Sequence, residues 1–202
     1  MPLPWIRRIR QAKELTVFNK GGAWGASVTT AVATFNGLGF GVTLVAAAEE
    51  KAANIVAKLS DGNEVYPYYG QNVKANFDAN LTHGQAAPLA DKNKRDPDSA
   101  AEIYFAVVFL PAKIKNLTAK QKELIVVHEF IHACGMTSPQ FANSASENHD
   151  TVGIMAAQMK KDGDGFIEYL TPKGATAMPP IRVGGHTMCV MRKLWAGEEC
   201  RR

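Results

Sequence analysis

Two histidines and a glutamate stand together in the apolar stretch "VVHEFIHACGM" (126–136), where they form the pattern H-E-x-x-H. On an α-helix, side chains four residues apart project from the same face, one turn from each other. The imidazoles of His128 and His132 can therefore reach a single metal ion. Glu129, rotated by about 100° from His128, then lies beside that ion. Histidine is a common zinc ligand, with a bond of about 2.0–2.1 Å from the imidazole nitrogen to the metal. We therefore interpret the two histidines as zinc ligands.

A glutamate in this place has a defined chemical task. Zinc lowers the pKa of a bound water to about 7 and polarises a scissile carbonyl. Glu129 can accept the proton of that water and then deliver it to the leaving amine. The motif therefore predicts metal-assisted hydrolysis, with zinc as the cofactor and Glu129 as general base and acid.

The motif is expected on a helix that follows a core strand. The segment "AEIYFAVVFLP" (101–111) is an almost continuous apolar run, which is typical of a strand buried on both faces. Thr118 and Gln121 then have the spacing of a capping box, and Gly135 is placed to end the helix in a left-handed conformation. An apolar stripe runs along this helix at Leu124, Val127 and Ile131.

The remaining pattern predicts a mixture of strands and helices. The stretch 63–100 is rich in turn residues, and its part 91–99 is interpreted as a solvated loop. Strands are expected at 14–20, 40–47 and 53–60, and further helices at 24–39 and 186–195.

Composition limits the classes of protein. The 202 residues are 46% hydrophobic and 21% charged, which is enough for a globular domain with a real core. The net charge of +4 comes largely from arginines at the two ends, which favours solvated termini over a nucleic-acid site. No apolar run is long enough for a membrane span and no secretory signal is visible. We therefore expect no nucleic-acid or membrane partner, and cytoplasmic synthesis with a non-classical export route as the alternative.

The three cysteines, Cys134, Cys189 and Cys200, have unrelated spacings. An odd and sparse count argues against a disulfide framework and is typical of a reducing compartment. No C-x-x-C pair is present, so a thiolate zinc site is not expected. Cys134 is interpreted as a buried residue.

At the expected helix the sequence resembles the metzincin clan of zinc endopeptidases, whose signature is HExxHxxGxxH. The segment 31–62 looks like the helix and strand order of the clan, and 175–197 looks like its methionine turn and closing helix. The resemblance implies an endopeptidase that acts on a protein or peptide substrate. The segment "HEFIHACGMTS" (128–138) matches the signature at His128, Glu129, His132 and Gly135.

The final histidine of the signature is replaced by Ser138, and serine is a poor zinc ligand. His149, the next histidine along the chain, is the favoured third ligand. Asp150 is an alternative ligand, or a hydrogen-bond partner of a ligand imidazole. Glu147 would give a site with two histidines and one glutamate.

The resemblance also implies two further elements of the site. Met178, in "MPP", matches the methionine turn beneath the ligands, and Met155, in "VGIM", is the rival. The segment 80–90 is similar to the rim that pairs with the substrate backbone, so we expect an extended substrate along an edge strand near 80–90. The rim residues are Leu81, Gly84 and Ala86.

The expected fold class is α+β and metzincin-like, in a single metalloprotease domain over 1–202. A twisted mixed sheet with helices forms an upper lobe over 1–135, which carries the zinc helix. A small irregular lobe with a terminal helix covers 136–202. The expected function is zinc-dependent peptide hydrolysis. Alternatives are a non-catalytic, zinc-stabilised binding or structural protein and a zinc amidase that acts on a non-peptide amide; the oligomeric state is left open.

Overall fold

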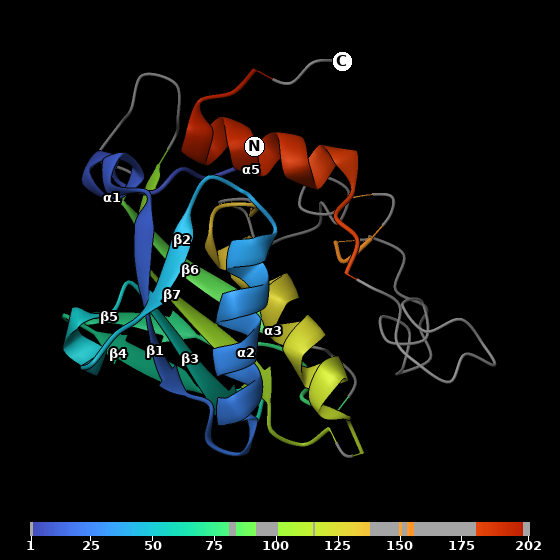
Figure 1. Ribbon diagram of the computed structural model, residues 1–202. Coiled ribbons are helices and arrows are strands. Elements are labelled where there is room, and N and C mark those ends of the chain that lie inside the picture. Colours follow the sequence, from blue (N-terminus) through green and yellow to red (C-terminus); the bar gives the residue numbers. More distant parts are fainter. Residues whose placement is uncertain are drawn as a thin grey trace.

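The computed structural model describes residues 2–80, 84–91, 101–114, 116–137, 150, 153–155 and 181–199. These residues form an α+β fold with a mixed sheet and several helices (Figure 1). The strands are β1 (Glu14–Lys20), β2 (Thr43–Ala46), β3 (Ile55–Ser60), β4 (Val65–Tyr68), β5 (Gln71–Lys74), β6 (Gln85–Asp91) and β7 (Glu102–Pro111). The helices are α1 (Arg7–Ala12), α2 (Gly25–Gly37), α3 (Ala119–Ala133) and α5 (Gly185–Ala196), with short 3-10 turns η1 (Gly22–Trp24) and η2 (Glu50–Ala52).

The main sheet has the strand order β2-β1-β3-β7-β6. The first four strands are parallel, whereas β6 runs antiparallel to β7 at one edge. The expectation of a mixed sheet is therefore confirmed. Among the described residues, no strand pairs with the outer side of β6, which lies in the segment that the sequence indicated as a substrate rim.

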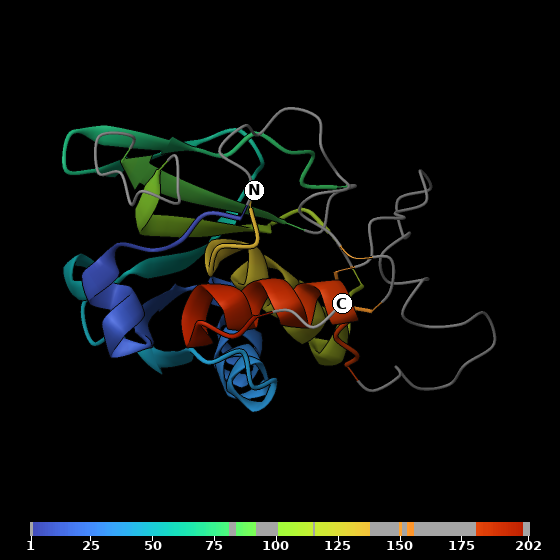
Figure 2. The same ribbon diagram turned by 90° about the horizontal axis from the view of Figure 1, so that it is seen from above.

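Both faces of the sheet are covered. Helices α2 and α3 pack on one face, and the β4–β5 hairpin lies on the other (Figures 1 and 2). Strand β7 shows why its sequence is apolar without alternation. Ala106, Val108 and Leu110 belong to the core on the helix side, whereas Phe105, Val107 and Phe109 belong to the core on the hairpin side.

The edge strand expected near 80–90 is present as β6, whereas the strands β4 and β5, in the same turn-rich stretch, were not expected. The strands β4 and β5 are four residues long and join through Tyr69 and Gly70, which both have positive φ. Such short strands, with Pro67 inside one of them, carry little periodic pattern. Their stability comes from stacking on the sheet, where the ring of Tyr68 lies 3.6 Å from that of Phe105 between centroids.

The expectation about cysteines was correct for Cys134 and wrong for Cys189. Cys134 is a buried free thiol. Cys189, on α5, is disulfide-bonded. An odd number of cysteines excludes complete pairing, but it does not exclude a single bridge. No helix of the described part of the chain has the length and apolar content needed to cross a membrane.

Candidate metal centre

Helix α3 begins at the capping box that the sequence predicts. The Thr118 hydroxyl accepts a hydrogen bond from the backbone N–H of Gln121 at 3.2 Å, and the Thr118 N–H donates to the Gln121 side chain at 2.8 Å. The helix then packs against α2, with the rings of Phe35 and Phe130 edge to face at 6.4 Å. Most of α3 is buried; His128 is fully buried, whereas His132 is partly exposed.

The two histidines lie one turn apart on α3, with ring centroids separated by 4.8 Å. Nδ1 of His128 lies 2.7 Å from the carbonyl oxygen of Ile154, and Nδ1 of His132 lies 2.7 Å from that of Met136. A carbonyl only accepts, so Nδ1 must donate in both rings. When the rings are neutral, Nε2 is then unprotonated and can bind a metal ion. Metal-binding histidines often use this tautomer, with Nδ1–H bonded to a carbonyl.

Glu129 points toward the edge strand β6. Its side chain is almost fully buried and accepts a hydrogen bond from the backbone N–H of Ala86. A Cβ atom on Gly84 would lie 3.0 Å from Cγ and 3.1 Å from Oε1 of Glu129. Gly84 therefore leaves room for the carboxyl group. Two of the three predicted rim residues thus flank the predicted general base.

Burial raises the pKa of Glu129 to about 8, although the hydrogen bond from Ala86 acts in the opposite direction. A carboxyl group with such a pKa can both accept and release a proton near neutral pH, as a general base and acid must. Burial also raises the pKa of the Cys134 thiol well above its ordinary value. Cys134 therefore stays protonated, and we do not consider it a metal ligand.

Two tryptophans, one from each terminal segment of the chain, hold the C-terminal end of α3. The indole N–H of Trp5 donates to the carbonyl of Ala133 at 3.0 Å, and that of Trp195, on α5, donates to the carbonyl of Cys134 at 2.9 Å. Gly135 follows with φ of 117°, and a Cβ atom there would lie 2.5 Å from a backbone carbonyl of the N-terminal segment. The glycine of the motif is thus required by conformation and by space.

Asp150 is the one candidate third ligand among the described residues, and it contacts the N-terminus of α5. Oδ2 of Asp150 accepts hydrogen bonds from the backbone N–H of Thr187 at 2.9 Å and from its hydroxyl at 3.0 Å. The N-cap of α5 is Gly184, which has no side chain to offer. A Cβ atom on Gly184 would collide with the Asp150 carboxyl at 2.1 Å. Asp150 therefore caps α5 from a distant part of the sequence.

Met155 lies in a short buried segment that contacts His128 through its neighbour Ile154. Its side chain is fully buried in the same core as α3. The preceding residue, Ile154, provides the carbonyl that orients His128. The backbone N–H of Ile154 donates to the backbone carbonyl of Arg182 at 2.8 Å, so this short segment is held between α3 and the residues that lead into α5.

The structure brings together His128, Glu129 and His132 with Gly84 and Ala86. Sequence reasoning missed the capping role of Asp150 and the two tryptophans at the end of α3, because each acts across more than 30 residues of sequence. Four predicted residues lie outside the described residues, namely Leu81, Glu147, His149 and Met178.

Within the described ranges, no cluster of three or more histidine, cysteine or carboxylate side chains forms a complete metal-binding group. The histidine pair is thus a partial donor set, whose tautomers fit a metal ion. No protein-family model matches the chain, and no curated protein shows significant similarity to it.

The buried Glu129 predicts a pH-dependent stability of the zinc-free protein. An unfolded glutamate titrates near 4.5 and the folded one near 8, so the folded state binds more protons between these values. The contribution is fully present below about pH 4.5 and falls by about 1.4 kcal/mol per pH unit as the pH rises toward 8. Urea unfolding of chelator-treated protein across this range measures it. Glu129→Gln should lack this slope, and identical pH profiles for variant and wild type would contradict the assignment.

The cap provided by Asp150 predicts a second effect on stability. Asp150→Ala leaves the Thr187 N–H without its acceptor and should lower the free energy of unfolding by about 1–2 kcal/mol. Asp150→Asn keeps a good capping oxygen and should cost clearly less. Urea denaturation followed by tryptophan fluorescence measures both. Equal losses for the two variants would show that the cap is not the source of the effect.

Proposed function

We propose that the chain is a zinc-dependent endopeptidase with a metzincin-like architecture, in which Glu129 transfers the proton. The observation that carries this proposal is the pair of Nδ1-to-carbonyl hydrogen bonds, which present Nε2 of His128 and His132 as metal-binding nitrogens beside a buried glutamate. Core histidines with a purely structural role do not need the same tautomer on adjacent turns. The supporting feature is the antiparallel edge strand β6 next to Glu129.

In the proposed reaction each residue of the site has a separate role. His128 and His132 hold zinc, which supplies Lewis-acid chemistry when bound. The Glu129 carboxylate accepts a proton from the attacking water and returns it to the nitrogen of the leaving amine. The N–H of Ala86 fixes the orientation of that carboxylate. An extended substrate pairs with the open edge of β6, which places its backbone beside Glu129.

His149 remains our proposed third ligand. Asp150, the residue after it, directs its carboxylate oxygen to the N-terminus of α5. Because this carboxylate oxygen already bonds to α5, we favour a structural role for Asp150, next to the proposed ligand His149, over direct binding of zinc. Met155 is also better supported than Met178 as the methionine beneath the site, because it adjoins the carbonyl that orients His128.

The proposal is tested by hydrolysis of casein and of an internally quenched peptide library by the purified, zinc-loaded protein. Cleavage should disappear on dialysis against a chelator and return with added zinc. Hydrolysis of small non-peptide amides without peptide cleavage would instead indicate an amidase. Stoichiometric zinc with no hydrolysis of any of these substrates would indicate a zinc-stabilised binding or structural protein and would refute the proposed function.

A further inference from the structure

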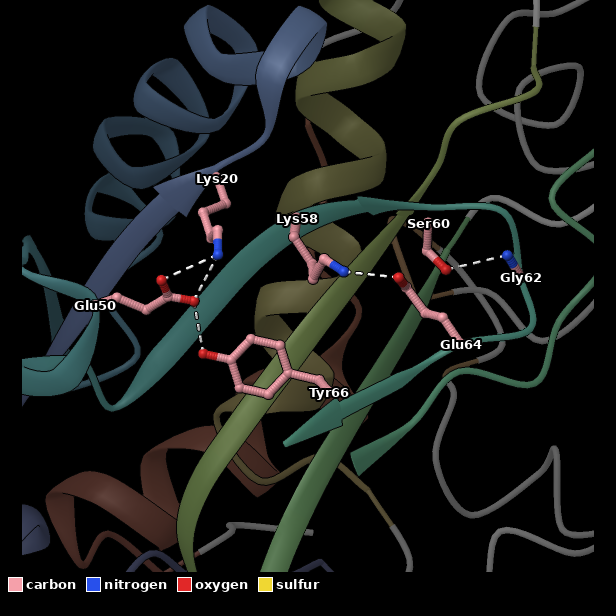
Figure 3. A network of polar contacts seen from close by, with 7 residues as sticks. All are labelled: Lys20, Glu50, Lys58, Ser60, Gly62, Glu64 and Tyr66. Carbon is pink, nitrogen blue, oxygen red and sulfur yellow. Dashed lines mark hydrogen bonds and ion pairs between the residues drawn. The ribbon is translucent and has the colours of Figure 1, made fainter. Parts of the chain in front are cut away.

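A groove of about 520 Å³ lies on the face of the sheet opposite to α3. One side is formed by the tyrosines of the β4–β5 hairpin, Tyr66, Tyr68 and Tyr69. Polar side chains of β1, η2 and β3 form the other side (Figure 3). This groove takes no part in the proposed hydrolytic site.

Tyr69 has a strained backbone conformation. It occupies the first position of the two-residue turn with φ of 43°, and 81% of its surface is exposed. A bulky residue with this conformation is an outlier, and asparagine or glycine would satisfy the same turn without strain. The ring gains little burial, since its contact is an edge-to-face pair with Tyr68 at 4.8 Å. Stability of the fold does not account for an aromatic side chain at this point, whereas contact with a ligand does.

The polar side of the groove carries balanced charge. Glu50 accepts hydrogen bonds from Lys20 at 2.9 and 3.0 Å and from the Tyr66 hydroxyl at 2.8 Å. Burial and the bond to Glu50 raise the pKa of Tyr66, so its hydroxyl stays protonated. The groove thus offers fixed donors and acceptors with little net charge. The other lysines are paired in the same way, Lys58 with Glu64 at 2.7 Å and Lys51 with Glu49 at 2.9 Å.

These features disfavour two kinds of ligand. A polyanion gains little attraction from lysines that are already matched by glutamates. A polypeptide that adds to β4 as a further strand meets Pro67, which has no N–H to donate. A ligand that fits the groove therefore has an apolar face to pack on the exposed ring of Tyr69. It also has neutral groups that both donate and accept hydrogen bonds.

We propose that this groove binds a neutral saccharide chain. The C–H face of a sugar ring carries partial positive charge and packs on the negative face of the Tyr69 ring. Each sugar hydroxyl both donates and accepts, and so can donate to Glu50 and accept from Lys20 or Lys58. The groove is open to solvent rather than enclosed, which suits a chain better than a single enclosed sugar. This binding does not depend on Glu129 or on a metal ion.

Calorimetric titration of the full chain with cellohexaose, chitohexaose and maltohexaose tests the proposal. At least one of the three should bind with a Kd on the order of 1 mM or tighter. Tyr69→Asn should weaken that binding at least about tenfold, while its melting temperature stays equal to or above that of the wild type, because asparagine fits the turn. Tyr69→Phe keeps the ring and should bind within about threefold of the wild type. Glu129→Gln should bind as the wild type does.

Absence of binding by all three oligosaccharides at millimolar concentration would overturn the proposal, as would unchanged binding by Tyr69→Asn. Binding of a single-stranded oligonucleotide or a proline-rich peptide that Tyr69→Asn abolishes would also refute it. Two sources of saccharide remain distinguishable within the proposal. Retention on an insoluble polysaccharide indicates a free polymer, whereas binding to a glycoprotein that is lost on deglycosylation indicates a protein-linked glycan.

Discussion

Glu129→Gln is expected to reduce peptide hydrolysis by roughly 10²–10⁴-fold while zinc stays bound. Glutamine has the size of glutamate and can still accept the hydrogen bond from Ala86, so the local packing between α3 and β6 is preserved. It cannot accept the proton of the attacking water. Initial rates on a quenched peptide, measured beside the zinc content of the same sample, give the result.

The matched control for this variant is Glu123→Gln, also on α3. Glu123 is buried and bonded to Thr34 and Lys120 at 2.6 and 2.8 Å, away from the histidine pair. Its replacement should change stability but not the rate per bound zinc. Hydrolysis by Glu129→Gln at the wild-type rate would eliminate the proposed role of this residue.

His149→Ala is expected to cause the second large effect, the loss of zinc. Removal of an inner ligand should weaken binding by more than the roughly 10–100-fold that follows from loss of an outer hydrogen-bond partner. Equilibrium dialysis against a competing chelator measures the affinity. The predicted order is a severe loss for His149→Ala and a modest one for Asp150→Asn, which keeps the cap on α5.

Glu147→Ala serves as the third arm of this comparison and should bind zinc as the wild type does. If Asp150→Asn lost zinc while His149→Ala kept it, the carboxylate would be the ligand and the assignment to His149 would be wrong. Loss with Glu147→Ala alone would indicate a site of two histidines and a glutamate.

Local signals accounted for the elements nearest the motif. The capping box at Thr118 and the apolar run of β7 are set by spacing within a few residues, and both were predicted from the sequence. The same holds for β1, which spans the predicted residues 14–20. The α+β class followed from these elements, because a buried strand that leads into a buried helix restricts the architectures that remain.

Contacts between distant segments could not be predicted in this way. The burial of Glu129 depends on Gly84 and Ala86, more than 40 residues earlier in the chain, and the raised pKa follows from that packing. The cap that Asp150 places on α5 has no local pattern, because the acceptor and the helix are 37 residues apart. The β4–β5 hairpin was missed because stacking on Phe105, rather than strand periodicity, holds it in place.

The most direct test of the zinc centre is X-ray absorption at the zinc K-edge of the wild-type protein. We predict one zinc per chain with imidazole nitrogens at about 2.0–2.1 Å, and multiple-scattering features of histidine rings that weaken in His128→Ala and His132→Ala. A sulfur neighbour at about 2.3 Å, or an unchanged spectrum in both variants, would place the metal elsewhere and contradict the assignment of α3 as the metal-binding helix.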